Sequence, residues 1–200
     1  MIINKDTFIL ASSSKSRFNI LKNCGLRFNQ VNPKCDEEEL KKKINKSLKK
    51  PNNIVKILSY EKAKSISETK RFFNDFVIGC DTLVYLNRNI FDKAKSLKEA
   101  KKKIQTLSGK THKIVSGITV CNKGKKIWQD TETSSVKIRK LKSLQINNYL
   151  NKTGKQILSS VGCYQIEALG PIIIEDIKGD YFNIMGLPLF KLLRFLHKPK

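Results

Sequence analysis

The stretch FVIGCDTLVYL, residues 76–86, is the most strand-like segment in the first half of the chain. It consists mostly of β-branched, aromatic and aliphatic residues, which favour a buried strand. Asp81 interrupts this apolar run, and burying a charge is costly unless the charge is paired or binds a cation. Its carboxylate could hold a divalent ion, accept a proton from water, or simply bond to neighbouring backbone at a strand end. The stretch therefore predicts an inner strand with one carboxylate of catalytic or structural importance.

Strands and helices alternate along the rest of the chain. Residues 96–99 (SLKE) have the spacing of a capping box at a helix start, and residues 122–124 (NKG) supply hairpin chemistry between two strands. The highly charged residues 36–50 predict a surface excursion, and Pro51 begins another helix. We expect one α/β domain over residues 1–200 with a central mixed sheet. The other predicted strands are residues 8–11, 26–31, 112–121, 127–138 and 172–176, and the other predicted helices follow residue 14 and cover residues 143–150 and 187–196.

The formal net charge of +23 is the most prominent feature of the composition. It favours an anionic partner, such as nucleic acid, a membrane surface or a small polyanion. Only six of the 40 basic residues are Arg, however, whereas nucleic-acid readers use Arg for bidentate contacts. The abundance of Lys, Asn and Ile is also what an AT-rich coding sequence gives without selection for binding. Nucleic acid is therefore not the partner we expect first.

Cysteine spacing and hydropathy restrict the class of protein. The five cysteines form no CxxC pair, and the two histidines are far apart in the sequence, so we expect reduced thiols and neither a zinc site nor a disulfide framework. The first residues lack the pattern of a secretory signal, and no apolar stretch reaches membrane-spanning length. These features predict a cytoplasmic protein without membrane contact.

Residues 12–17 (SSSKSR) are a candidate phosphate site between a predicted strand and a predicted helix. Backbone N–H groups at a helix start converge there, and Arg17 adds positive charge. The segment lacks the glycines of a P-loop. A serine-capped helix without any ligand explains the same residues.

Further candidates are spread along the chain, and each has a structural alternative. Glu37 lies in an acidic run that could hold a metal ion or simply be solvated. Lys62 and Lys93 could bind phosphates as point charges, although Lys is common throughout the chain. His112 could be a base, but its strand-like surroundings favour a core or surface histidine. Residues 162–170 and 183–188 combine glycines with polar groups, so they could approach a flat ligand, with Tyr164 and the polar residues beside it recognising a base edge, or form tight turns.

Taken in order, these segments resemble the Maf family of nucleoside triphosphate pyrophosphatases. The resemblance runs from Leu10 to Leu196, and the fixed order of the segments makes it specific although each segment alone is weak. The matching segments are residues 10–17 (LASSSKSR), 36–37 (DE), 61–63 (EKA), 79–82 (GCDT), 93–94 (KA), 107–112 (LSGKTH), 162–170 (GCYQIEALG) and 183–188 (NIMGLP).

The resemblance implies a single elongated α/β fold like that of inosine triphosphate pyrophosphatase, with a mixed sheet and a cleft between two lobes. It also implies attack by water on the α-phosphorus of a nucleoside triphosphate, with pyrophosphate leaving. Asp81 would accept the proton, and Asp81 and Glu37 would help to hold Mg²⁺ or Mn²⁺. A homodimer is common in the family. The substrate-binding residues implied by the resemblance, or by departures from the family pattern, are Ser14, Arg17, Lys62, Thr82, Lys93 and Glu167.

Departures from the family pattern leave the preferred base open. Thr82 agrees with the branch that prefers pyrimidine triphosphates, whereas the branch that hydrolyses methylated guanosine triphosphate tends to have glutamine there. Glu167 replaces a glutamine of the pyrimidine branch, and a carboxylate accepts hydrogen bonds but cannot donate them. Ser16 stands where the family has an arginine, and Ala94 where it has a proline.

Two other classes of function compete with the enzyme. A nucleic-acid-binding protein would account for the charge, but its lysines would be clustered on one face or joined by aromatic platforms. A regulator of cell division that binds nucleotides without turnover would fit the family's link to septum formation. The ordered polar segments around Asp81 favour turnover, because binding a polyanion does not require a carboxylate.

Overall fold

The computed structural model describes residues 7–44, 50–87 and 89–197. They form a mixed seven-stranded sheet with the order β2-β1-β3-β5-β6-β7, in which β4 pairs with β3 beside this path. The pairing is parallel between β1 and both β2 and β3, and antiparallel for β3 with β4 and for β6 with β7. The predicted α/β class with a mixed sheet is therefore confirmed. The strands are β1 (Phe8–Ala11), β2 (Phe28–Val31), β3 (Val77–Leu86), β4 (Asn89–Phe91), β5 (Thr111–Asn122), β6 (Lys125–Ile138) and β7 (Ile174–Lys178).

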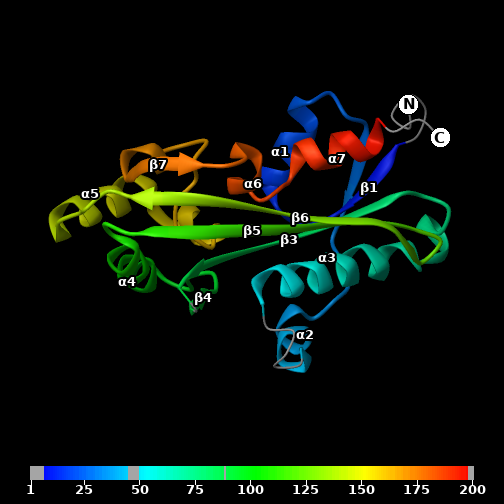
Figure 1. Ribbon diagram of the computed structural model, residues 1–200, viewed down its shortest axis with the longest axis horizontal. Helices are drawn as coiled ribbons and strands as arrows, with labels where there is room; N and C mark the ends of the chain where they lie inside the picture. Colours follow the sequence, from blue (N-terminus) through cyan, green and yellow to red (C-terminus); the bar gives the residue numbers. More distant parts are fainter. Residues whose placement is uncertain (1–6, 45–49, 88, 198–200) are drawn as a thin grey trace. The chain divides into compact units, whose positions relative to one another are not determined.

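Seven α-helices and three short 3₁₀ segments occur in the described part of the chain (Figure 1). The α-helix α3 begins at Pro51, as predicted, because proline fits the first helical turn. Ser96 caps α4 by accepting a hydrogen bond from the Glu99 N–H. The helices are α1 (Lys15–Asn23), α2 (Glu37–Lys43), α3 (Pro51–Ser67), α4 (Leu97–Leu107), α5 (Ser143–Thr153), α6 (Tyr181–Ile184) and α7 (Leu189–Leu196), and the 3₁₀ segments are η3 (Lys70–Phe72), η4 (Gly154–Ser159) and η5 (Gly170–Ile172).

The chain divides into two compact units. Unit 1 comprises Met1–Thr82, Val115–Glu132 and Gly186–Lys200, and unit 2 comprises Leu83–Ile114 and Thr133–Met185. The long strands β3, β5 and β6 each contribute residues to both units.

Each unit has its own apolar cluster. In unit 1, side chains from β1, α3, β3 and β5 pack together, including Ile9, Ala63 and Val77. In unit 2, the cluster is built from α4, α5, parts of β3, β5 and β6, and the segments around η4 and η5, and it includes Ile104 and Tyr149. The cysteines are free, and three of the five are buried, so the prediction of reduced thiols is confirmed. The described helices include none with the length and apolar character needed to cross a membrane.

Several local predictions need correction. Residues 36–50 were expected to be a surface excursion, and residues 36–42 are indeed exposed or partly exposed. The helix α2, which begins at Glu37 and is capped by the Asp36 side chain, was not predicted there, and residues 45–49 lie outside the described part. The strand expected at 172–176 is β7, two residues later. The short elements β4 and α6 were not predicted, because three or four residues show no clear periodicity.

Candidate functional site

The loop from β1 into α1 folds around two serines. Ser14 is the N-cap of α1, and its hydroxyl accepts a hydrogen bond from the Arg17 N–H at 3.4 Å. The buried Ser12 hydroxyl accepts a hydrogen bond from the Ser14 N–H at 3.2 Å. Two backbone N–H groups of the predicted phosphate cradle are therefore bound to serine side chains in this structure.

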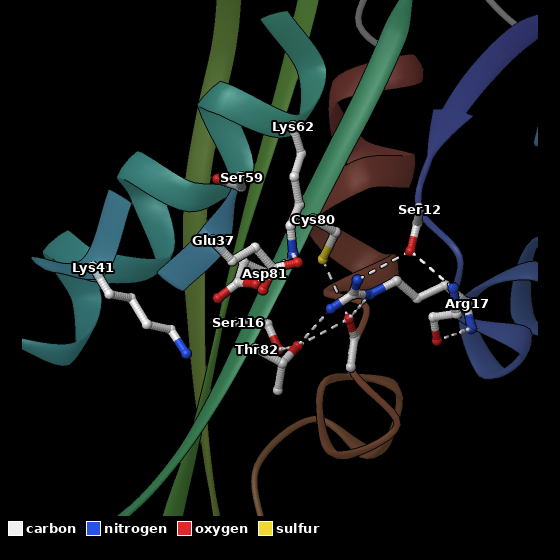
Figure 2. Close-up of polar contacts among 12 residues, drawn as sticks. Ser12, Arg17, Glu37, Lys41, Ser59, Lys62, Cys80, Asp81, Thr82 and Ser116 are labelled. Carbon is white, nitrogen blue, oxygen red and sulfur yellow. Dashed lines mark hydrogen bonds and ion pairs between the residues drawn. The ribbon is translucent and has the colours of Figure 1, made fainter. Parts of the chain in front are cut away.

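Arg17 points into unit 1 rather than toward solvent. Arg17 is only 9% exposed, and three of its nitrogens donate hydrogen bonds to protein oxygens. Nε donates to the Gly186 carbonyl at 2.8 Å, Nη1 to the Ser12 hydroxyl at 3.1 Å and Nη2 to the Thr82 hydroxyl at 3.0 Å (Figure 2). A buried guanidinium requires such partners, because an unpaired charge away from water is costly. Arg17 therefore joins three segments that are distant in the sequence.

Thr82 and Gly186 form the other side of this polar cluster. The Thr82 hydroxyl lies 2.8 Å from the Ser116 hydroxyl and 3.2 Å from the Gly186 carbonyl oxygen. That carbonyl also accepts a hydrogen bond from the Cys80 thiol at 3.2 Å. Gly186 has φ of +100°, a conformation that favours glycine, which explains a glycine at this turn.

A second cluster joins α3 to β3 through Lys62. Its ammonium lies 2.6 Å from Asp81 Oδ1 and 2.8 Å from Glu37 Oε1 (Figure 2). Lys62 and Asp81 are both 5% exposed. Burial alone raises the pKa of Glu37, but the charge of Lys62 and its hydrogen bond outweigh that effect, so the pKa is lowered. Glu37 therefore stays ionised, and one cation faces two carboxylates.

Close packing of α3 on the sheet explains why Lys62 reaches Asp81. Gly79 and Asp81 are two residues apart on β3, so both face the same side of the sheet. A Cβ atom at Gly79 would lie 2.2 Å from the Ser59 carbonyl oxygen and 2.6 Å from the Ala63 nitrogen. The missing side chain thus allows the helix to lie directly on the strand, with Lys62 beside Asp81.

The carboxylates of this cluster fit a hard divalent cation. The Asp81 Oδ2 atom is buried and has no hydrogen-bond partner among the residues that the structure describes. Mg²⁺ is usually held by one or two protein carboxylates together with phosphate oxygens. Glu37 and Asp81 provide two such groups, although no group of three or more metal-ligating side chains occurs in the described ranges.

The predicted residues of unit 2 are placed differently. Lys93 lies between β4 and α4, and Glu167 lies before η5; both are exposed and both interact with other groups. Tyr164 was considered for recognition of a base, but it is 4% exposed within the apolar cluster of unit 2. That hypothesis is wrong, because its hydroxyl lies 2.5 Å from His112 Nε2 inside the core.

His112 is a core histidine. It is fully buried, and burial lowers its pKa from 6.5 to about 4, so the ring is neutral near pH 7. The alternative of a catalytic base is not supported by this position, whereas the interpretation as a core residue is confirmed.

The structure therefore brings together six of the predicted site residues within unit 1: Ser14 with Arg17 and Thr82, and Glu37 with Lys62 and Asp81. Ser116 was missed by the sequence analysis. A polar residue inside the apolar run of β5 was the available signal, since such a side chain requires a partner.

Comparisons with known proteins show a family match and named relatives along nearly the whole chain. The model of the family described as Maf-like protein matches residues 7–199. A 7-methyl-GTP pyrophosphatase of Bartonella quintana (strain Toulouse) is 43% identical over 188 residues, which are 94% of this chain and 93% of the relative. A nucleoside triphosphate pyrophosphatase of Caulobacter vibrioides is 39% identical over 187 residues, covering 94% and 92%. A 7-methyl-GTP pyrophosphatase of Brucella abortus is 36% identical over 192 residues, covering 96% of both. Because the family model and these relatives span nearly the whole chain, the protein belongs to the Maf family.

Proposed function

We propose that this protein hydrolyses nucleoside triphosphates to nucleoside monophosphate and pyrophosphate. Water attacks the α-phosphorus, the bond to the bridging oxygen of the β-phosphate breaks, and the water proton leaves to a base. The observation that supports this proposal is the cluster formed by the buried Lys62 and Asp81 with the partly exposed Glu37, in a chain whose relatives are named pyrophosphatases.

Asp81 is the proton acceptor in this proposal. Its Oδ1 is bound to Lys62, whereas its buried Oδ2 has no described hydrogen-bond partner and is available to a water molecule or a cation. A carboxylate that is fixed in this way needs little reorganisation when the proton is transferred.

Cationic groups bind the triphosphate. The reaction increases negative charge on phosphate oxygens, and positive groups around them stabilise the transition state. We assign this role within unit 1 to Lys62 and Arg17, together with backbone and hydroxyl groups near Ser14. Glu37 and Asp81 would hold Mg²⁺ or Mn²⁺, which supplies further neutralisation of the phosphate oxygens.

We also propose which base the enzyme prefers. Two of the relatives described above are named 7-methyl-GTP pyrophosphatases, so we propose 7-methyl-GTP as the leading substrate. Thr82 instead predicted a pyrimidine, but its hydroxyl is bound within the protein by Arg17, Ser116 and Gly186. Glu167 is exposed and carries acceptors only, which suit the N–H groups on a guanine edge.

An assay of pyrophosphate release tests both the proposed reaction and the proposed base preference. Purified protein with Mg²⁺ is given 7-methyl-GTP, GTP, UTP and TTP, and the products are quantified by chromatography. Asp81→Asn should lower kcat by about 100-fold or more, within the range of lost general-base catalysis. Asp176→Asn, an exposed aspartate of β7, is the matched control and should leave the rate unchanged.

The ranking of substrates identifies the base. Faster release from UTP or TTP than from 7-methyl-GTP would support the pyrimidine preference instead. Nucleotide binding without any product would reject the enzyme and favour the non-catalytic regulator. Tight binding of a nucleic acid, without hydrolysis of any nucleotide, would favour a nucleic-acid-binding protein.

A further inference from the structure

The ammonium of Lys62 lies at the point where two carboxylates converge. It is 2.6 Å from Asp81 Oδ1 and 2.8 Å from Glu37 Oε1, and the side chains of Lys62 and Asp81 are 6% and 7% exposed. Figure 2 shows Lys62 extending from α3 toward both acidic side chains. Lys62 thus has the position relative to these carboxylates that a cation bound by them would have.

Electrostatics explains why a cation is required there before any ligand binds. The Asp81 carboxylate is buried and the Glu37 side chain is 44% exposed. The two carboxylates repel each other where they converge, and an unpaired buried charge is strongly destabilising. The positive charge of Lys62 compensates part of the repulsion between the two carboxylates and leaves one net negative charge on the cluster. A compact ammonium on a flexible four-carbon stem suits this role, because it can leave by rotating its side chain while the helix stays in place.

The backbone of α3 is fixed independently of Lys62. A Cβ atom at Gly117 of β5 would lie 2.4 Å from the Val55 carbonyl oxygen, which shows direct contact between helix and strand. The Ser59 hydroxyl also bonds to the Thr119 hydroxyl at 2.8 Å. Movement of the Lys62 ammonium therefore requires no movement of the helix.

We propose that Lys62 is the resting counter-ion of Glu37 and Asp81, and that a divalent cation displaces its ammonium from both carboxylates. In this exchange no covalent bond changes: two ion pairs break, and the carboxylate oxygens bind the incoming cation instead. The subsequent transfer of the ammonium to a triphosphate rests on the proposed function. The exchange itself does not, so it occurs in the absence of nucleotide.

The exchange has a thermodynamic consequence for the order of binding. Without nucleotide, the cation competes with Lys62 and binds weakly. With a triphosphate present, the displaced ammonium finds phosphate oxygens, so each ligand increases the affinity of the other by the same factor.

Binding of Mn²⁺ without nucleotide tests the competition. Free Mn²⁺ is measured by electron paramagnetic resonance during titration of the native protein, Lys62→Met and Lys64→Met. Methionine keeps most of the volume of the lysine stem but removes the charge. Lys62→Met should bind Mn²⁺ about tenfold more tightly, in the range of one neighbouring opposite charge. Lys64, on the same helix and paired with Glu68, is the matched control and should match the native protein.

Equal or weaker Mn²⁺ binding by Lys62→Met would overturn the proposal. Circular dichroism establishes that each variant is folded. If Lys62→Met does not fold, a measurement on the native protein decides the question. Acetylation of lysines by a soluble ester is followed by mass spectrometry with and without Mn²⁺. Lys62 should become several-fold more reactive with Mn²⁺ while Lys64 stays constant, and unchanged Lys62 reactivity at saturating Mn²⁺ contradicts the exchange.

These tests separate the exchange from the proposed activity. Neither requires turnover, because both are carried out without nucleotide. A protein that exchanges Lys62 for Mn²⁺ but never releases pyrophosphate contradicts the proposed function alone. A protein that releases pyrophosphate, yet whose Lys62→Met variant binds Mn²⁺ no better, contradicts the exchange alone.

Discussion

Hydrogen bonds join buried polar side chains in both units, and His112 with Tyr164 is such a pair in unit 2. The ring of His112 is fully buried, and its Nε2 lies 2.5 Å from the Tyr164 hydroxyl. The pair links β5 to the segment 162–170, which the resemblance associates with the base. Its role in this structure is to hold that segment in the core.

Burial of His112 makes the free energy of unfolding depend on pH. Burial lowers the pKa of His112 from 6.5 in a free chain to about 4 in the fold. As the pH falls through this window, the unfolded chain takes up a proton that the folded protein excludes. The stabilisation is therefore complete above pH 6.5 and decreases progressively toward about pH 4, by up to about 3 kcal/mol.

Urea unfolding at several pH values measures this effect. His112→Gln cannot titrate, so its stability should fall less than that of the native protein between neutral and mildly acidic pH. Parallel curves for the two proteins would show that His112 does not contribute to the pH dependence.

At the same scale, the sequence singled out several side chains that the structure brings together, but it did not predict the directions in which they point. The cost of burying a charge identified Asp81, and the structure places it 2.6 Å from Lys62. The direction of Arg17 could not be predicted, because its Nε partner is the Gly186 carbonyl, 169 residues away. For Tyr164 the sequence left recognition of a base and a tight turn as alternatives, since local sequence does not distinguish a core tyrosine from a ligand-facing one.

At the scale of elements, the position of α3 on the sheet controls the site. Val55 contacts β5 at Gly117, and Ser59 and Ala63 contact β3 at Gly79. These three helix residues are spaced by four, so they form one stripe along α3. Lys62 lies next to this stripe and therefore depends on the two glycines for its position.

Gly117→Ala should reduce activity through this contact. The new Cβ would lie 2.4 Å from the Val55 carbonyl oxygen, so α3 must move and displace Lys62. A displacement of about 1 Å at a reacting group can lower the rate by about 100-fold, and we expect a loss in kcat of about 10- to 100-fold. The variant's kcat in the pyrophosphate assay measures the effect.

Gly25→Ala provides the control for this prediction. Gly25 has φ of +69°, and no atom lies within 4 Å of the position that a Cβ would occupy, so alanine there costs stability without contact with α3. A similar loss of kcat in both variants would mean that reduced stability alone explains the effect of Gly117→Ala.

Elements with strong local signals were predictable and the others were not. Pro51 marked the start of α3, and residues 122–124 marked the hairpin between β5 and β6, where Lys123 and Gly124 have positive φ. The helix α2 was missed because its charged sequence resembles solvated surface. It is held in part by the bond between Glu37 and Lys62, which no local pattern reveals.

At the scale of the whole molecule, the net charge of +23 should steer anionic substrates toward the protein. Long-range attraction is screened by salt, with a Debye length of about 10 Å at 0.1 M ionic strength. The kcat/KM for a nucleoside triphosphate should therefore fall several-fold between about 50 and about 500 mM KCl, mainly through KM.

Steady-state kinetics at a fixed concentration of free Mg²⁺ tests this prediction. Constant kcat/KM over the range of salt would show that the lysine-rich surface does not aid binding, as expected if its composition reflects coding bias alone.

The single domain over residues 1–200 stays a prediction, since the structure describes two compact units that share three strands.

The hydrogen bond from Arg17 to Gly186 has a consequence for biosynthesis. The donor lies 169 residues before the acceptor in the sequence. During translation, the ribosome must therefore make all the segments between them, from β2 to α6, before this guanidinium can meet its acceptor. A nascent chain that stops short of Gly186 leaves the Arg17 Nε–H without this partner. The polar cluster around Arg17 thus forms only after Gly186 has been synthesised, so that shorter nascent chains lack one half of it.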